Sequence, residues 1–390
     1  MAITGKDEGS HGGRIRLGMV GGGEGAFIGA VHRLAARMDD HYSFVAGALS
    51  STPDKSLRSG AALGLDPKRI YSSFEEMAKK EARRKDGIEA VAIVTPNHMH
   101  AGPALAFLKA GIHVICDKPL TTSLKEALKL QAAAEKSGKI FAVTHNYTGY
   151  PMVRQARAMV AAGELGEIRV VQVEYAQDWL AEPLEQTGQK QADWRTDPSR
   201  SGAGGCIGDI GTHAYNLADF ITGIPVVEVS AELTSFVEGR RLDDDTHVRL
   251  HYANGAKGTL WASQVAVGNE NALRIRVYGT KGGLSWSQEN PNYLQFSQLG
   301  KPSLTLSRGG IRTSEAAGRM TRIPAGHPEG YLEGFANLYT EIAHAIRASR
   351  QGAKPDAEVL FPTIEDGVKG LAFIEAAVAS SAKAGRRTKI

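Results

Sequence analysis

The sequence predicts an α/β protein with two domains, the first built on a parallel sheet and the second on a large open, mostly antiparallel sheet. Three observations support this prediction. The chain has 390 residues, which is more than one ordinary hydrophobic core contains. Apolar runs typical of strands alternate with helical patterns up to about residue 147. Beyond residue 168, strand-like runs follow one another without helices between them, which favours antiparallel pairing.

Composition narrows the possible functions. Charged residues make up 23% of the chain and the formal net charge is +4, without a long basic block, so we expect no nucleic-acid partner. The two cysteines, Cys116 and Cys206, exclude a disulfide framework and favour a reducing compartment. No apolar run approaches the roughly 20 residues of a membrane span. We therefore expect a soluble, cytoplasmic protein, with a disordered tail over the polar residues 1–14.

A glycine-rich turn follows the first expected strand, Arg16–Val20. A helical period begins directly after the turn. This order of strand, glycines and helix is the context of the dinucleotide-binding fingerprint, present here as G-x-G-x-x-A over Gly21, Gly23 and Ala26. A glycine-rich turn without a ligand is the alternative interpretation of these residues alone.

The fingerprint residues have distinct physical roles. Gly21 permits the tight turn, and Gly23 lets the backbone approach a pyrophosphate. The first helical residues, Phe27 and Ile28, offer N–H groups to the anion. We therefore expect residues 15–147 to form an NAD(P)-binding Rossmann domain.

The rest of this domain continues the alternation of strands and helices. Further strands are expected over Phe44–Leu49, Arg69–Tyr71, Ala90–Val94, His113–Cys116 and Ile140–Thr144, with helices over 54–63, 73–85, 100–110 and 123–137. Ligands of such sheets bind beyond the carboxyl ends of the strands. The residues at these ends that we expect to contact the cofactor are Thr95, Pro96, Asn97, Asp117, Lys118 and Asn146.

The choice between NAD and NADP depends on the end of the second strand. NAD-specific sites usually carry an acid there to bind the ribose 2′-hydroxyl. This chain has Ser50 and Ser51 instead, with Lys55 and Arg58 nearby. We expect NAD as the cofactor, with NADP not excluded.

The second domain, residues 148–390, is expected to bind substrate and to form oligomers. Its strands are expected over Ile168–Tyr175, Val226–Phe236, Thr246–Tyr252, Lys257–Val267, Leu273–Tyr278 and Gly283–Trp286. Asn254-Gly255 predicts a hairpin between two of them. Helices near 331–349 and 363–384 close the chain.

A glycine-rich segment of this domain opens a helix that ends at Gly223. Asp209 and His213 are four residues apart on it, so they project from the same face. A carboxylate beside an imidazole can fix its tautomer and make it a base. A helix acid next to a core histidine is the alternative interpretation.

Two polar stretches are suited to line a cleft. Asp178-Trp179 follows a strand end, and Trp194-Arg195 lies in a long polar loop. A tryptophan face with neighbouring acid and arginine suits a polyol, although ordinary loop aromatics would also fit. His98 and His100 have no acid or cysteine cluster beside them, so we expect no metal site.

Three motifs together resemble the Gfo/Idh/MocA oxidoreductases, named for glucose–fructose oxidoreductase and inositol dehydrogenase. They are TPNHMH (95–100), HVICDKPL (113–120) and GDIGTHAYNLADF (208–220), and the resemblance covers residues 15–390. It implies a nucleotide contact at His100, a catalytic Lys118, and Asp209 and His213 as substrate-binding and base residues. It also implies a homodimer or homotetramer. Elements near Trp179 and Arg195 are similar to the branch with levoglucosan and scyllo-inositol dehydrogenases.

The chain departs from this family pattern at three places. Asp117 stands where the family has Glu. The pair that resembles the family's G-x-x-H is Gly29 and His32, so the phosphate loop is about three residues longer. The acid after the second strand is missing.

The expected function is NAD(P)-dependent oxidation of a secondary hydroxyl of a sugar, glycoside or cyclitol to a ketone. The substrate residues are expected to be Lys118, Tyr147, Asp178, Trp179, Trp194, Arg195, Asp209 and His213. Either Lys118 or His213 would accept the proton. Two alternatives are an NAD-dependent glycosidase that oxidises transiently, and a nucleotide sensor without activity.

Overall fold

The computed structural model describes residues 13–390, so the expected tail over 1–14 lies almost entirely outside the described residues. The chain divides into two compact units. The first comprises residues 13–121, Lys125–Asn146 and Tyr331–Val368. The second comprises Thr122–Leu124, Tyr147–Gly330 and Lys369–Ile390.

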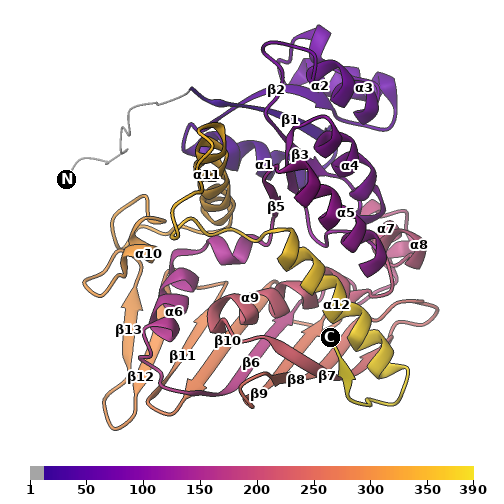
Figure 1. Ribbon diagram of the computed structural model, residues 1–390. Helices are drawn as coiled ribbons and strands as arrows, with labels where there is room; N and C mark the ends of the chain where they lie inside the picture. The colour runs from indigo at the N-terminus through magenta and orange to yellow at the C-terminus, as the bar shows by residue number, and fades with distance from the viewer. Residues whose placement is uncertain (1–12) are drawn as a thin grey trace. The chain divides into compact units, whose positions relative to one another are not determined.

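The first unit is built on a five-stranded parallel sheet with the strand order β2-β1-β3-β4-β5, which confirms the predicted Rossmann fold. Helices α3, α4 and α5 lie on one side of it, and α1 and α11 on the other (Figure 1). The bounds are β1 Ile15–Gly21, α1 Phe27–Met38, β2 Tyr42–Ala48, α2 Pro53–Ala62, α3 Phe74–Glu81, β3 Ala90–Val94, α4 Ala101–Lys109, β4 His113–Cys116, α5 Leu124–Ser137, β5 Phe141–Val143 and α11 Tyr331–Arg350.

Burial explains why these strands form the centre of the unit. Every residue of β3 and β4 is buried, as expected for parallel strands that are covered by helices on both faces. The strand expected at Arg69–Tyr71 is wrong. Pro67–Arg69 form a short 3₁₀ turn that Asp66 caps, and Ile70 makes only an isolated bridge to Gly47. The proline that opens this turn and the side-chain cap favour a tight turn over a strand.

Helix α11 belongs to the first unit, whereas the sequence analysis assigned it to the second domain. Its apolar face carries Phe335, Leu338 and Ile342, which join the core that contains α1 and β1. The hydroxyl of Tyr42 also donates to the main-chain oxygen of Tyr339 at 2.9 Å. Helical periodicity predicts such an apolar face but does not specify the surface that it packs against.

The second unit is built on a nine-stranded sheet with the order β13-β12-β11-β10-β6-β9-β8-β7-β14. The β6–β9 pair is parallel and the other pairs are antiparallel, as the prediction of a mostly antiparallel sheet required. The strands are β6 Ile168–Ala176, β7 Val226–Thr234, β8 Asp245–Tyr252, β9 Lys257–Ser263, β10 Ala272–Gly279, β11 Gly282–Ser287, β12 Tyr293–Gln298, β13 Leu304–Ser307 and β14 Thr388–Lys389.

Helices cover one face of this sheet (Figure 1). They include α6 Pro151–Ala161, α9 Thr212–Thr222 and the second half of α12 Ile364–Ser381, whose Phe373 stacks on Tyr215 of α9. The short helices α7 Lys190–Arg195, α8 Pro198–Ser201 and α10 Glu315–Gly318 lie in the connections. Helix α6 and strands β12 and β13 were not predicted. Within the described part of the chain, no helix is long and apolar enough to cross a membrane.

Candidate active site

The turn after β1 has the geometry of a phosphate-binding loop. Gly21 and Gly22 have φ values of +80° and +72°, which favour glycine. A Cβ on Gly29 would lie 2.3 Å from the Cα of Gly22. Gly29 is therefore the glycine that lets α1 pack closely against the turn, and the loop before it is longer than the family pattern.

The start of α1 fits an anionic ligand. Ala26 is the N-cap residue, and no side chain within residues 13–390 caps this helix end. Its first turn also contains no acid. The N–H groups at this end, with the helix dipole, are suited to the pyrophosphate of a dinucleotide.

Gly23 contacts the protein more closely than the sequence analysis assumed. Its N–H donates to the main-chain oxygen of Leu49 at 3.1 Å, and a Cβ would lie 2.6 Å from the same oxygen. A side chain at residue 23 would therefore collide with the end of β2. In the segment that follows, Ser50 Oγ accepts from Thr52 N at 3.2 Å and Ser51 is exposed.

His100 connects two of the predicted strand ends. Its Nε2 lies 2.9 Å from the main-chain oxygen of Thr95, and its Nδ1 lies 2.8 Å from that of Pro119. Burial lowers the pKa of His100, so the ring carries one proton and donates to one of these oxygens at a time. Both ring nitrogens face main-chain oxygens, so His100 positions the loops after β3 and β4.

Asp117, which precedes Lys118, is held from within the first unit. Its Oδ1 accepts from Thr144 Oγ1 at 2.6 Å and lies 3.2 Å from His32 Nε2. Burial alone would raise the pKa of Asp117, but His32 and Thr144 outweigh it, so the pKa is lowered. His32 Nδ1 in turn lies 2.8 Å from the hydroxyl of Tyr339. The shorter acid at residue 117 therefore has two partners, His32 and Thr144, at one of its carboxylate oxygens.

His145, at the end of β5, also lies in the surroundings of Lys118. Burial, followed by the positive charge of Lys118, lowers the pKa of His145 to about 3. This histidine is therefore neutral near pH 7. His145 was not predicted as a site residue. The neighbouring Asn146, which was predicted to contact the cofactor, is 2% exposed.

In the second unit, four of the predicted substrate residues come together. Asp209 Oδ2 accepts from Arg195 Nε at 3.1 Å. The Arg195 guanidinium lies 4.2 Å from the ring centre of Trp194 and 5.9 Å from that of Trp179. Gln264 Nε2 donates to the same Asp209 oxygen at 2.9 Å. Gln264 was not predicted as a site residue, because it lay inside the strand expected over Lys257–Val267, whereas β9 ends at Ser263.

Asp209 lies in a π-helical turn, Ile207–Gly211, which leads into α9. Asp209 and His213 are thus separated by a change from π-helix to α-helix, and not by one regular α-helical turn. Such π turns are frequent at functional sites.

Asp178 is another of the predicted substrate residues. Its carboxylate accepts from Gly268 N at 3.0 Å.

His213 packs against a hydrogen-bonded aromatic group. Its ring centre lies 4.9 Å from that of Tyr147 and 6.3 Å from that of Tyr175. The two tyrosine hydroxyls are 2.5 Å apart, and Tyr175 donates to Asn271 Oδ1 at 2.7 Å. Burial raises the pKa of Tyr147. Tyr147 therefore contacts His213 through its ring, while its hydroxyl belongs to this network.

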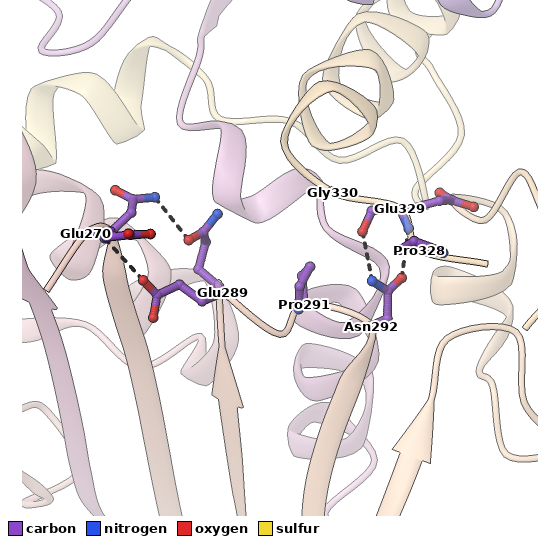
Figure 2. Close-up of a pocket in the computed structure, with 9 residues that line it drawn as sticks. Glu270, Glu289, Pro291, Asn292, Pro328, Glu329 and Gly330 are labelled. Carbon is purple, nitrogen blue, oxygen red and sulfur yellow. Dashed lines mark hydrogen bonds between the residues drawn. The ribbon is translucent and has the colours of Figure 1, made fainter. Parts of the chain in front are cut away.

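Asn271 also lines a polar cavity of about 540 Å³ in the second unit (Figure 2). Its Nδ2 donates to Gln288 Oε1 at 3.0 Å, and its N–H donates to Glu289 Oε1 at 3.2 Å. None of the nine lining residues is basic: Glu270, Asn271, Gln288, Glu289, Pro291, Asn292, Pro328, Glu329 and Gly330. This wall of amides and carboxylates is suited to groups that donate hydrogen bonds.

Comparisons with known proteins agree with this geometry. Residues 15–145 match the model of the oxidoreductase family with an NAD-binding Rossmann fold, and residues 153–285 match that of the GFO/IDH/MocA C-terminal domain. The crystal structure of an oxidoreductase from Sinorhizobium meliloti is 56% identical, with a TM-score of 0.88 over 97% of this chain and 100% of that chain.

Two characterised proteins are more distant. An inositol dehydrogenase homologue from Azotobacter vinelandii, solved with NADH and myo-inositol, is 37% identical, with a TM-score of 0.90 over 97% of this chain and 98% of that one. Levoglucosan dehydrogenase from Pseudarthrobacter phenanthrenivorans is 28% identical over 73% of this chain and 76% of that protein. The chain is therefore an NAD-binding oxidoreductase, and it belongs to the Gfo/Idh/MocA family.

Proposed function

We propose that the protein oxidises a secondary hydroxyl of a cyclitol, sugar or glycoside to a ketone, with NAD as the hydride acceptor. The observation that carries this proposal is the Asp209 cluster. There, one carboxylate is fixed by Arg195 and Gln264 beside the faces of two tryptophans. A carboxylate and a guanidinium bind hydroxyls, and an aromatic face suits the C–H side of a ring.

The polar cavity beside Asn271 supports the same substrate class. None of its lining residues is a lysine or arginine, and the carboxylates of Glu270 and Glu289 can accept from hydroxyls, whereas Glu329 is paired with Arg308; this favours a ligand with many hydroxyls. Asn271 also links this cavity to the tyrosines that pack on His213. Two relatives point in the same direction, since one was solved with myo-inositol and another is named for levoglucosan.

The proposed roles follow from charge and position. We assign Lys118, which lies beside neutral His145, to stabilise the alkoxide that forms as the hydroxyl loses its proton. If His213 accepts that proton, Lys118 acts as the ammonium throughout; if Lys118 accepts it, Lys118 enters the step as the neutral amine and becomes the ammonium that stabilises the alkoxide. Asp209 orients the substrate. The bound NAD supplies hydride acceptance, and the residues of the phosphate loop and of the strand ends hold it.

The test is a panel of cyclitols, free sugars and glycosides with NAD and with NADP. We expect NADH to accumulate in proportion to ketone for one ring polyol. Release of an aglycone without NADH would replace the dehydrogenase proposal by a glycosidase that oxidises transiently. NADPH formation at a comparable rate would show that Ser50, Ser51 and Lys55 accept a 2′-phosphate. Cofactor binding without turnover of any compound would favour the nucleotide sensor.

We also propose that the protein forms a homodimer or homotetramer through the uncovered face of its nine-stranded sheet. Alternate residues of this face, including Gln172, Arg249 and Arg274, are exposed in the single chain. The helices of the second unit cover only the opposite face (Figure 1). Light scattering at micromolar concentration tests this assembly, and a mass of one chain would contradict it.

A further inference from the structure

The segment that carries Asp209 is anchored by one buried acid outside the cluster described above. Asp243 immediately precedes Asp244 and β8, and it is 9% exposed. Its Oδ1 accepts from Gly205 N at 2.6 Å and its Oδ2 from Ile207 N at 2.8 Å. Its main-chain oxygen accepts from Cys206 N at 2.7 Å. Three successive N–H groups, those of residues 205–207, thus donate to a single residue.

These contacts hold the chain directly before Asp209. The π-helical turn begins at Ile207, whose N–H is the last of the three donors. Close packing reinforces the hydrogen bonds, because a Cβ on Gly205 would lie 2.3 Å from the main-chain oxygen of Asp243. Within residues 13–390, no lysine or arginine pairs with Asp243. Its charge is therefore balanced by the N–H groups of this segment, in the manner of an anion in a backbone nest.

The next residue fixes a partner of Asp209. The main-chain oxygen of Asp244 accepts from Gln264 N at 2.8 Å, and the side chain of Gln264 donates to Asp209. Asp244 itself is fully buried and accepts from Phe236 N at 2.8 Å and Val237 N at 3.0 Å. The pair 243–244 therefore fixes both the backbone before Asp209 and the backbone of Gln264, whose side chain binds Asp209.

We infer that Asp243 is a positioning residue for the reaction, which holds Asp209 in its working place without touching substrate. This inference rests on the proposed function for its kinetic readout. Positioning matters because a displacement of about 1 Å at a reacting group can lower a rate by roughly 10²-fold.

The test compares Asp243→Asn with Asp245→Asn. Asp245 lies in the same tripeptide, is 8% exposed, and bonds to Trp261 Nε1 at 3.0 Å and not to the segment 205–207. Asparagine is nearly isosteric with aspartate, but its NH₂ group would face one of the N–H donors. We expect Asp243→Asn to lower kcat/KM by about 5- to 10-fold with unchanged NAD affinity, and Asp245→Asn to stay within about twofold of the wild type.

A double-mutant cycle distinguishes positioning from general damage. If Asp243 acts through Asp209, Asp243→Asn should lower kcat/KM by less than about twofold in an Asp209→Asn background. Equal losses in both backgrounds, or no loss in the wild-type background, would overturn the inference. Gly205→Ala disturbs the contact between residues 205 and 243 without changing Asp243. It should lower kcat/KM in the wild-type background but not in the Asp209→Asn background. This variant tests the inference if Asp243→Asn does not fold.

Amide hydrogen exchange makes the test independent of the proposed reaction. Exchange over residues 205–211 should rise in Asp243→Asn and not in Asp245→Asn. If the wild-type protein oxidised no polyol, the proposed function would fail while this exchange result still tested the anchor. If Asp209→Asn slowed turnover but Asp243→Asn changed neither rate nor exchange, only the inference would fail.

Discussion

Lys118 and Asp209 are supported in different ways. Around Lys118 the neighbouring residues are fixed, with His100 between two main-chain oxygens and Asp117 between His32 and Thr144. At Asp209 the reactive carboxylate itself is fixed, by Arg195 and Gln264. The first arrangement joins strand ends to helix α1, and the second joins a π-helical turn to α7 and to the residue after β9. The comparison implies that substitution of Asp209 should also disturb Arg195 and Gln264, which share its carboxylate.

The largest effect is expected for Lys118→Ala. It should lower kcat by roughly 10²-fold or more, the usual scale for a positioned acid–base group, and leave NAD affinity largely unchanged. Lys118→Arg should not restore activity, because a guanidinium is bulkier and keeps its proton at working pH. Steady-state kinetics and a cofactor titration check both statements. Near wild-type turnover in a folded Lys118→Ala would mean that the Asp117–Lys118 pair is structural.

Asp209→Asn should have a smaller effect than Lys118→Ala. The amide keeps one oxygen that Arg195 and Gln264 can share, but it loses the charge that pairs with the guanidinium. We expect kcat/KM to fall by between about 10- and 100-fold, with part of the change in KM because Asp209 orients substrate. A loss larger than that of Lys118→Ala would reverse the assignment of roles.

Ala26→Asp tests the phosphate loop without the collision that a side chain at Gly23 would cause. An acid at this uncapped N-cap position should stabilise α1 by about 0.5–1 kcal/mol. It should also repel the pyrophosphate and weaken NAD binding about tenfold. Ala26→Ser is the control, because it caps the helix without a charge and should keep most of the affinity. Calorimetric titration and thermal melts measure the two effects, and unchanged affinity in Ala26→Asp would place the pyrophosphate elsewhere.

The two sites also differ in how far the sequence could predict them. The strand-end motifs at 95–100 and 113–120 are contiguous, so their position at one edge of a parallel sheet follows from the order of strands and helices. The link from His32 to Asp117 was not predicted, although both residues were named, because it depends on how α1 packs against β4. The Rossmann fold and the mostly antiparallel second sheet were predicted for the same reason as the motifs, from local periodicity.

The Asp209 cluster could be predicted only in part. Its tryptophans and arginine were selected by residue type, and the structure brings them to Asp209. Gln264 and Asp243 carry no local signal, because their partners lie 55 and 36–38 residues away along the chain. The packing partner of α11 is a similar case. An apolar face indicates that a helix is buried, but it does not specify which residues cover it. Tertiary contacts determine those residues.

Titration should separate two buried histidines of the first unit from Asp243 of the second by sign. In the first unit, burial lowers the pKa of His113 to about 4 and that of His145 to about 3. Their unfolded forms bind protons below about pH 6.5, so the stability that these histidines contribute is lost as the pH falls from about 6.5 toward 4. In the second unit, burial raises the pKa of Asp243 to about 6. Its folded form therefore binds the proton first, and stability is gained as the pH falls from about 6 toward 4.

These opposite signs can be tested by two substitutions and thermal melts at pH 7 and pH 5. Between pH 7 and pH 5, each histidine should lower the free energy of unfolding by about 2 kcal/mol, and Asp243 should raise it by about 1 kcal/mol. His113→Asn keeps an acceptor for Ile140 N, which now donates to His113 Nδ1 at 2.9 Å. It should reduce the fall of the melting temperature between the two pH values by a few degrees. Asp243→Asn should increase that fall, because it removes the compensating group. If both substitutions changed the fall in the same direction, the contrast between the buried histidines and Asp243 would be wrong.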